Sequence, residues 1–134
     1  MDVAVFGTRN DDNLNRIYRL CAFFGVERLY VVNSRAGIKG NLFSAKQQVK
    51  VLYVSGEEAF LDQYFPVIVG RVRMGAKPRQ IRYNKNALIC IGSEIAPVPR
   101  EVQGDITWTI PKYGKAPDLT ADQALAILLY AAMD

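Results

Sequence analysis

Short apolar runs recur along the chain, and each is bounded by glycine, proline or polar residues. Runs of this kind, with little alternation of polar and apolar residues, are typical of strands buried on both faces of a parallel sheet. The pattern predicts strands over residues 2–7, 28–33, 49–54, 65–72, 87–91 and 106–110.

Helical patterns lie between several of these runs. A helix is predicted over residues 14–24, with Asp11 or Asp12 as its N-cap and an apolar stripe made by Leu14, Ile17, Cys21 and Phe24. A capping box at Ser55 and Glu58 predicts a helix that ends near residue 64, and a short helix is predicted at 99–103. Strands that alternate with helices predict a single α/β domain over residues 1–134, with a mostly parallel sheet and helices on both faces.

The last predicted helix, residues 119–130, lacks a polar face. Thr120 is its predicted N-cap, and Gln123 stands three residues on, at the capping-box spacing. A surface helix normally shows one apolar stripe and one polar face, whereas this one is apolar on every side. It is too short to span a membrane. We therefore expect it to be buried by its own domain, by a second subunit, or by both.

Composition narrows the chemistry. The chain has 134 residues, half of them hydrophobic, which suits one globular domain. It has no histidine, which excludes His-based catalytic triads, imidazole general bases and the common zinc sites, and no metal is expected. Cys21 and Cys90 lie in separate apolar runs, which predicts two buried thiols in a reduced, cytoplasmic protein. No long apolar run or signal segment is present, so no membrane partner is expected.

Residues that directly follow strands are the first candidates for a site, because ligands of parallel sheets bind beyond the carboxyl ends of the strands. These candidates are residues 8–13, 70–73, 92–97 and 111–119. Neither the G-x-G-x-x-G pattern nor a phosphate-binding glycine–lysine loop occurs, which argues against an ordinary nucleotide-binding protein.

Three segments, in this order, resemble the motifs of SpoU-type (TrmH-type) RNA 2′-O-methyltransferases of the SPOUT superfamily. The first, residues 10–26, has Asn10, Asn13 and Arg19 at the family spacing and ends in Phe-Gly-Val. The second is a strand followed by Gly92-Ser93-Glu94. The third, residues 110–130, begins Ile-Pro-Lys-Tyr-Gly and continues through Asp-Leu-Thr into the apolar helix. The resemblance covers nearly the whole chain, without the amino-terminal RNA-binding extension of many relatives.

The resemblance implies a C-terminal trefoil knot in the α/β fold, which general connection rules would not predict. It also implies S-adenosylmethionine as the cofactor, held by backbone groups of three loops, and a homodimer with the last helix at its interface. The implied cofactor-binding residues are Gly70, Ile91, Gly92, Ser93, Ile110, Pro111, Tyr113, Gly114, Leu119 and Thr120.

The same resemblance assigns Arg19, Asn10 and Glu94 to catalysis. Because a guanidinium group stays protonated in proteins, we expect Arg19 to orient the ribose and its phosphate by a bidentate contact. Proton loss from the 2′-hydroxyl would be assisted by solvent or Glu94, and Asn10 would orient Arg19 or touch the substrate. Without the motif, these residues would be a solvated helix residue, a turn or cap residue and a helix-start carboxylate.

Basic residues are spread over several polar segments of the chain. The net charge is +4 and the sequence pI is about 9.2, which is compatible with a phosphate-rich partner. With RNA as the partner, tRNA or rRNA, the candidate contacts are Arg9, Arg16, Arg35, Lys39, Arg73, Lys77, Arg79 and Arg82. The alternative for residues 73–85, the densest basic run, is a solvated loop.

Two functions stay open at this point. The first is an S-adenosylmethionine-dependent RNA 2′-O-ribose methyltransferase that acts on tRNA or rRNA. The second is a non-catalytic SPOUT-fold protein that binds RNA or assists assembly while keeping the knot and possibly the cofactor. The chain departs from the family pattern at Asn15, Lys112, Asp118, Thr120 and Asp122. The second function rests on the changes at Asp118, Thr120 and Asp122, with the basic run of residues 73–85 intact.

Overall fold

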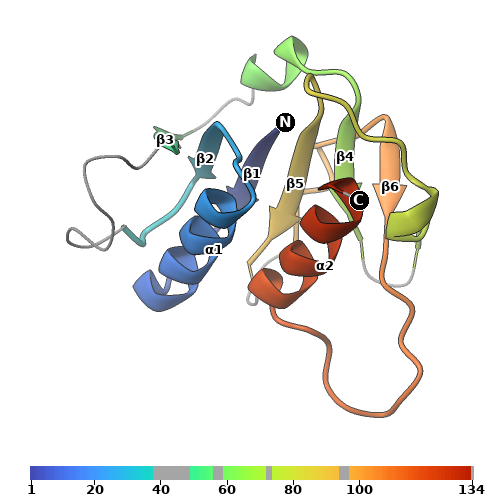
Figure 1. The fold of residues 1–134 in the computed structure, drawn as a ribbon. Helices are drawn as coiled ribbons and strands as arrows, with labels where there is room; N and C mark the ends of the chain where they lie inside the picture. Colours follow the sequence, from blue (N-terminus) through green and yellow to red (C-terminus); the bar gives the residue numbers. More distant parts are fainter. Residues whose placement is uncertain (38–48, 56–58, 72–73, 94–96, 134) are drawn as a thin grey trace.

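The computed structural model describes residues 1–37, 49–55, 59–71, 74–93 and 97–133 (Figure 1). Its strands form one sheet in the order β3-β2-β1-β5-β4-β6, and every neighbouring pair is parallel. The strands are β1 (Asp2–Phe6), β2 (Arg28–Val32), β3 (Lys50–Val54), β4 (Val67–Gly70), β5 (Leu88–Gly92) and β6 (Ile106–Trp108). Each overlaps a predicted strand, so the α/β fold with a parallel sheet is confirmed.

Both faces of the sheet are apolar. Successive residues of a strand point to opposite sides, so a continuous apolar run places apolar side chains on both faces. In β1, Val3 and Val5 belong to one buried cluster, whereas Ala4 and Phe6 belong to the other. All four side chains are at most 2% exposed. The continuous apolar runs of the sequence are therefore the consequence of burial on two sides.

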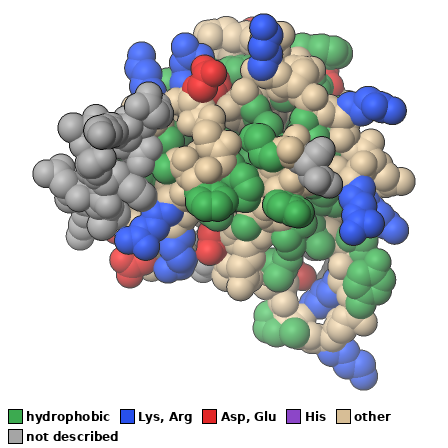
Figure 2. Space-filling view, in the orientation of Figure 1, with side chains coloured by type: hydrophobic (Ala, Val, Ile, Leu, Met, Phe, Trp, Pro, Cys, Tyr) green, Lys and Arg blue, Asp and Glu red, His purple; other side chains and the backbone are tan. Residues whose placement is uncertain are grey.

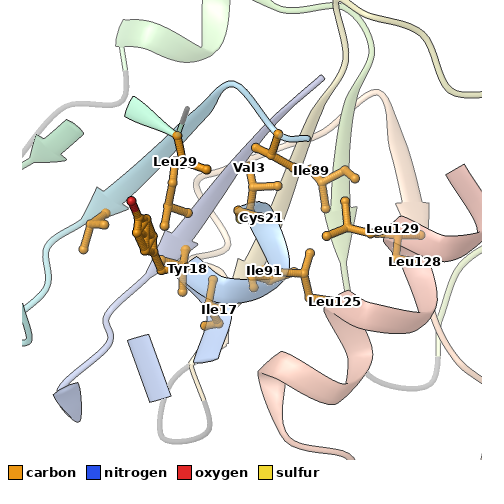
Figure 3. Close-up of a cluster of buried hydrophobic side chains, with 14 of the residues drawn as sticks. Val3, Ile17, Tyr18, Cys21, Leu29, Ile89, Ile91, Leu125, Leu128 and Leu129 are labelled. Atoms are coloured by element: carbon orange, nitrogen blue, oxygen red, sulfur yellow. The ribbon is translucent and has the colours of Figure 1, made fainter. Parts of the chain in front are cut away.

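The two α-helices, α1 (Asp11–Phe23) and α2 (Ala121–Met133), lie side by side on one face of the sheet (Figures 1 and 3). Helix α1 buries Ile17 and Cys21 there, and α2 buries Leu125, Leu128 and Leu129. The short 3-10 helix η2 (Pro78–Gln80) packs against α2.

The second face is covered by smaller elements. The 3-10 helix η1 (Ala59–Gln63) stacks Phe60 on Tyr30, with ring centroids 4.3 Å apart. Val98 and Val102 add buried side chains from a turn. The prediction of helices on both faces of the sheet is confirmed, although the helix on the second face is a 3-10 helix and not an α-helix.

Two local predictions are wrong, and a third is confirmed in part. The N-cap of α1 is Asn10, whose side-chain oxygen accepts from the N–H groups of Asp12 and Asn13, so neither Asp11 nor Asp12 caps the helix. An Asn one position earlier satisfies the same free N–H groups. Residues 99–103 form a turn closed by Val102 N–H to the carbonyl of Pro99, at 3.0 Å. The helix predicted to follow Ser55 is the 3-10 helix η1, and Glu58 of its capping box lies outside the described residues.

Helix α2 is buried on one face only within a single chain. Leu125, Leu128 and Leu129 are fully buried, whereas Tyr130 is 67% exposed and Ile127 and Met133 are also exposed. A single chain therefore does not bury the helix on every side, and burial of the remaining side by a second subunit stays a prediction, as does the trefoil knot. Among the described residues, no helix is long and apolar enough to cross a membrane.

Candidate functional site

The carboxyl ends of β4, β5 and β6 bring the predicted cofactor residues of three segments to one edge of the sheet. In the β-ladder, Val69 pairs with Cys90 and Gly70 pairs with Trp108. Gly70 ends β4, Ile91 and Gly92 end β5, and Ser93 follows directly. The structure therefore places Gly70, Ile91, Gly92 and Ser93 on adjoining strand ends, with Ile110 two residues beyond β6.

The segment after β6 projects from this edge as an extended loop (Figure 1). Tyr113 is 90% exposed, Leu119 is exposed, and a Cβ added at Gly114 would meet no atom within 4 Å. Residues 110–119 form no backbone hydrogen bond with any other described residue. Two departures from the family pattern form an ion pair within the loop, with 3.5 Å between Lys112 Nζ and Asp118 Oδ1. Pro111, Tyr113, Gly114 and Leu119 thus offer unpaired backbone groups but are not gathered around Gly92.

A residue that the sequence did not single out lies at this edge, at the end of the outermost strand β6. Trp108 ends β6, is 4% exposed, and has no hydrogen-bond partner for its indole N–H among the described residues. Its ring lies against Gly70, where an added Cβ would be 2.9 Å from Cζ2 and 3.2 Å from Nε1. The available signal was the single Trp of the chain two residues before the Ile-Pro motif. We predicted it only as a strand residue.

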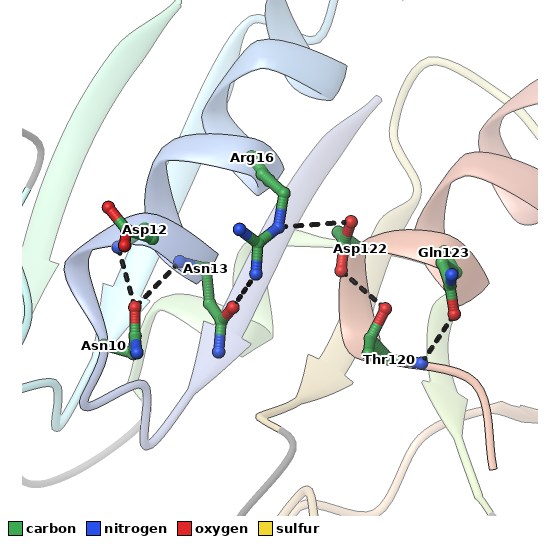
Figure 4. A network of polar contacts seen from close by, with 7 residues as sticks. All are labelled: Asn10, Asp12, Asn13, Arg16, Thr120, Asp122 and Gln123. Atoms are coloured by element: carbon green, nitrogen blue, oxygen red, sulfur yellow. Dashed lines mark hydrogen bonds and ion pairs between the residues drawn. The ribbon is translucent and has the colours of Figure 1, made fainter. Parts of the chain in front are cut away.

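The first and third motif segments meet at the N-terminal ends of α1 and α2 (Figure 4). The Arg16 guanidinium lies 3.5 Å from the Asp122 carboxylate and also donates to the side chain of Asn13. The Thr120 hydroxyl donates to the other oxygen of Asp122 at 2.7 Å. Asp122, a departure from the family pattern, therefore joins the two helices.

Thr120 makes one half of the predicted capping box. Its backbone N–H donates to the Gln123 side chain at 3.0 Å, while its hydroxyl bonds to Asp122 and not to a backbone N–H. The backbone carbonyl of Thr120 accepts from Ala124 at 3.0 Å, so the helix begins at the predicted place.

Arg19 is exposed on α1 and makes no hydrogen bond or ion pair with the described residues. Asn10 directs its side-chain oxygen to the start of the helix, and no hydrogen bond joins it to Arg19. The third predicted catalytic residue, Glu94, lies outside the described residues, as do Lys39 and Arg73. The catalytic roles of Arg19, Asn10 and Glu94 stay predictions.

The remaining candidate RNA contacts are all exposed, as phosphate binding requires: Arg9, Arg16, Arg35, Lys77, Arg79 and Arg82. Lys77, Arg79 and Arg82 gather at η2, next to α2. Arg16 differs from the others because its guanidinium is already paired within the chain.

Buried acidic and thiol groups have structural roles away from the carboxyl edge. Burial raises the pKa of both Cys21 and Cys90 to about 12, so neither is a thiolate nucleophile near neutral pH. Asp2, at the amino-terminal edge, accepts from the Tyr64 hydroxyl at 2.5 Å and from the Arg28 N–H at 3.0 Å. Burial and the hydrogen bond to Asp2 raise the pKa of Tyr64. No group of three or more potential metal ligands occurs within the described ranges.

Two open clefts are found away from the strand ends described above. One, of about 270 Å³, includes Asp2, Arg28 and Lys85 at the amino-terminal edge, and the other, of about 440 Å³, includes Asp62, Glu101 and Asp105. Neither cleft contains a residue of the three motif segments. The candidate site at the carboxyl edge therefore rests on the residue types gathered there and not on the presence of a deep cleft.

Comparison with known proteins gives a consistent result. The model of the SpoU rRNA methylase family matches residues 1–130. The chain superposes on the TrmH/SpoU tRNA modifying enzyme of A. aeolicus with a TM-score of 0.84 and 24% identity, covering 98% of this chain and 72% of that one. No curated protein matches the chain in sequence.

Two further solved structures share the fold. The AdoMet-bound rRNA methyltransferase from Sinorhizobium meliloti gives a TM-score of 0.77 at 22% identity, covering 97% of this chain and 54% of that chain. A protein studied for 2-OH methylation of C/U34 on tRNA gives 0.77 at 20% identity, covering 98% of this chain and 93% of that chain. The chain therefore spans about half of one relative and nearly all of the other.

Proposed function

Because this chain belongs to the SpoU rRNA methylase family, we propose that it is an S-adenosylmethionine-dependent RNA 2′-O-ribose methyltransferase that acts on tRNA or rRNA. One observation carries the proposal: the second and third motif segments follow the strands on either side of β4 at the carboxyl edge of the sheet, and the ion pair between Arg16 and Asp122 joins the third segment to the helix of the first. Arg19 lies on that helix. The reaction needs a methyl donor and an oriented ribose. The strand ends would hold the methyl donor, and Arg19 on α1 would orient the ribose.

The residues at the carboxyl edge suit the cofactor. Backbone groups of residues 110–119 and the buried N–H of Trp108 are donors and acceptors that make no hydrogen bond within the part of the chain that the structure describes. Gly70, Gly92, Ser93 and Ile110 would hold the cofactor from three strand ends, with Tyr113, Gly114 and Leu119 closing over it. Bound there, S-adenosylmethionine supplies an activated methyl group.

Arg19 orients the RNA for this transfer. Its exposed guanidinium, which no described residue engages, is available for a bidentate contact with a ribose-phosphate segment. Displacement at a methyl group depends on the alignment of donor and acceptor, so a fixed ribose contributes directly to rate. The exposed cluster Lys77, Arg79 and Arg82 binds neighbouring phosphates. Both free cysteines suit the reducing cytoplasm, where we place the protein.

Calorimetric titration with S-adenosylmethionine tests the proposed function first. We expect saturable binding at sub-millimolar concentration by the folded protein. Incubation with tRNA and rRNA from a strain that lacks the protein should then add a single 2′-O-methyl nucleoside, detected by mass spectrometry. A folded protein that binds no cofactor would rule out the enzyme.

A second function, RNA binding without catalysis, is favoured by one observation. The departures in the third motif segment are engaged with one another or with α1, since Lys112 pairs with Asp118 and Asp122 binds Thr120 and Arg16. Retention of RNA in a gel-shift assay, together with no methyl transfer to any RNA tested, would support this alternative.

We also propose that the active unit is a homodimer formed through α2. Ile127, Tyr130 and Met133 recur on the exposed side of the helix, and Figure 2 shows hydrophobic side chains gathered on the face that carries α1 and α2. Three exposed apolar residues on one helix are what a second copy would cover.

Tyr130→Asp is expected to convert the dimer to a monomer, because it places a charge in an apolar interface. Sedimentation velocity at micromolar concentration measures the change. Tyr113→Asp, the same substitution at an exposed loop residue, should leave the dimer intact. A wild-type monomer, or a Tyr130→Asp variant that stays dimeric, would contradict the proposed interface.

A further inference from the structure

The indole N–H of Trp108 is a buried donor without an acceptor. The side chain is 4% exposed, and its Nε1 atom has no hydrogen-bond partner among the described residues. Indole nitrogens that are buried usually find a partner, because an unpaired donor retains the cost of losing water. A donor that is unpaired in the free protein is a candidate to form a hydrogen bond with a ligand in the complex.

The position of this N–H links it to the proposed cofactor site. The edge of the indole that carries Nε1 lies against Gly70, since a Cβ there would be 3.0 Å from Cε2 and 3.2 Å from Nε1. Gly70 pairs with Trp108 in the ladder and ends β4, next to the end of β5 at Gly92. Only glycine permits this close approach, so Gly70 and Trp108 form one unit at the strand ends.

The surroundings of the ring determine which acceptor suits it. Trp108 belongs to the buried cluster that contains Ile89, Ile91 and Leu125. A carboxylate brought into such surroundings would lose its hydration at a high cost, whereas a neutral heteroaromatic nitrogen would lose much less. The flat purine of the cofactor is both apolar and rich in ring-nitrogen acceptors.

We propose that Trp108 is a cofactor-binding residue whose indole N–H donates a hydrogen bond to the adenine ring of S-adenosylmethionine. The proposal rests on the methyltransferase function proposed above and adds the purine-recognising residue of that site. It assigns to the strand-end tryptophan a role that the backbone groups of the three loops do not fill.

Trp108→Phe provides the test, because it keeps an aromatic ring and removes the N–H. Calorimetry should show about three- to tenfold weaker binding, the usual worth of one hydrogen bond, both for S-adenosylmethionine and for 5′-methylthioadenosine. The second ligand keeps the adenosine half and lacks the amino-acid carboxylate. The midpoint of urea unfolding without ligand should fall only modestly, because the smaller ring leaves a cavity while the variant also loses an unpaired donor. Tyr83→Phe, which removes a hydroxyl elsewhere in the same cluster, is the matched control.

The outcomes separate the two proposals. Equal affinity of Trp108→Phe and wild type would overturn the role of Trp108 and leave the methyltransferase in place. A loss for S-adenosylmethionine without a loss for 5′-methylthioadenosine would overturn the assignment to the purine. A folded wild type that binds neither ligand would overturn both proposals. Should the variant not fold, the single Trp of the wild type still reports: its emission should change on titration with 5′-methylthioadenosine, and constant emission at saturation would overturn the contact.

Discussion

Replacing Arg19 with alanine is expected to lower the rate of RNA methylation by about 100-fold or more, with cofactor affinity unchanged within about twofold. Arg19 is exposed and makes no hydrogen bond or ion pair with the described residues, so its removal takes away a substrate contact and no part of the fold. Single-turnover transfer of a labelled methyl group to RNA measures the first quantity, and calorimetry with S-adenosylmethionine measures the second.

Two variants on the same helix make this result specific. Arg19→Lys should recover little activity, because an ammonium group cannot make the two parallel hydrogen bonds of a guanidinium. Arg16→Ala should cost much less turnover, because Arg16 is held by Asp122 and Asn13 within the chain. Parallel losses of turnover and cofactor affinity in Arg19→Ala would refute the proposed role, and full activity would refute it as well.

Gly75→Ala is expected to lower the free energy of unfolding by about 2–4 kcal/mol. The residue has a φ of +132°, and an added Cβ would lie 2.6 Å from the carbonyl oxygen of Thr107. That backbone cannot withdraw freely, because Ala76 donates to Thr107 at 2.8 Å and accepts from Thr109 at 2.9 Å. Urea unfolding followed by circular dichroism measures the loss.

Gly114→Ala is the matched control for this substitution. Its Cβ would meet no atom within 4 Å, and its φ lies outside the region that favours glycine. The free energy of unfolding should therefore stay the same within about 0.5 kcal/mol or rise slightly, since alanine restricts the unfolded chain. Similar unfolding midpoints for the two alanine variants would show that the contact between Gly75 and Thr107 is not a constraint.

The strands were predictable because burial on both faces leaves a continuous apolar run, as in β1 and β5. Local hydrogen bonding was less predictable, because several neighbouring residues can satisfy the same N–H groups. Asn10, Asp11 and Asp12 are all suitable caps, and only the path of the chain after Gly7 decides among them. The extent to which one chain buries α2 was left open for a related reason: an all-apolar helix sequence does not indicate whether its own chain or a second subunit buries it.

The candidate site was predictable only in part. The prediction that Gly70, Gly92 and Ser93 lie at one edge is correct, because the carboxyl ends of parallel strands meet at the same edge of a sheet. The contact of Trp108 with Gly70 depends on the order β5-β4-β6, in which β6 pairs with β4 and not with β5, the strand that precedes it in the sequence. The ion pair between Arg16 and Asp122 likewise depends on two helices that are far apart in the chain.

The side-by-side arrangement of α1 and α2 has an electrostatic consequence. Both helices begin at the carboxyl edge, so the positive ends of both macrodipoles face the proposed site. Each first turn carries carboxylates, Asp11 and Asp12 in α1 and Asp122 in α2, which compensate that partial charge. A phosphate therefore gains little from the helix ends themselves, and its attraction must come from arginine and lysine side chains. The same carboxylates make the edge tolerant of a sulfonium cation, which uncompensated helix ends would repel.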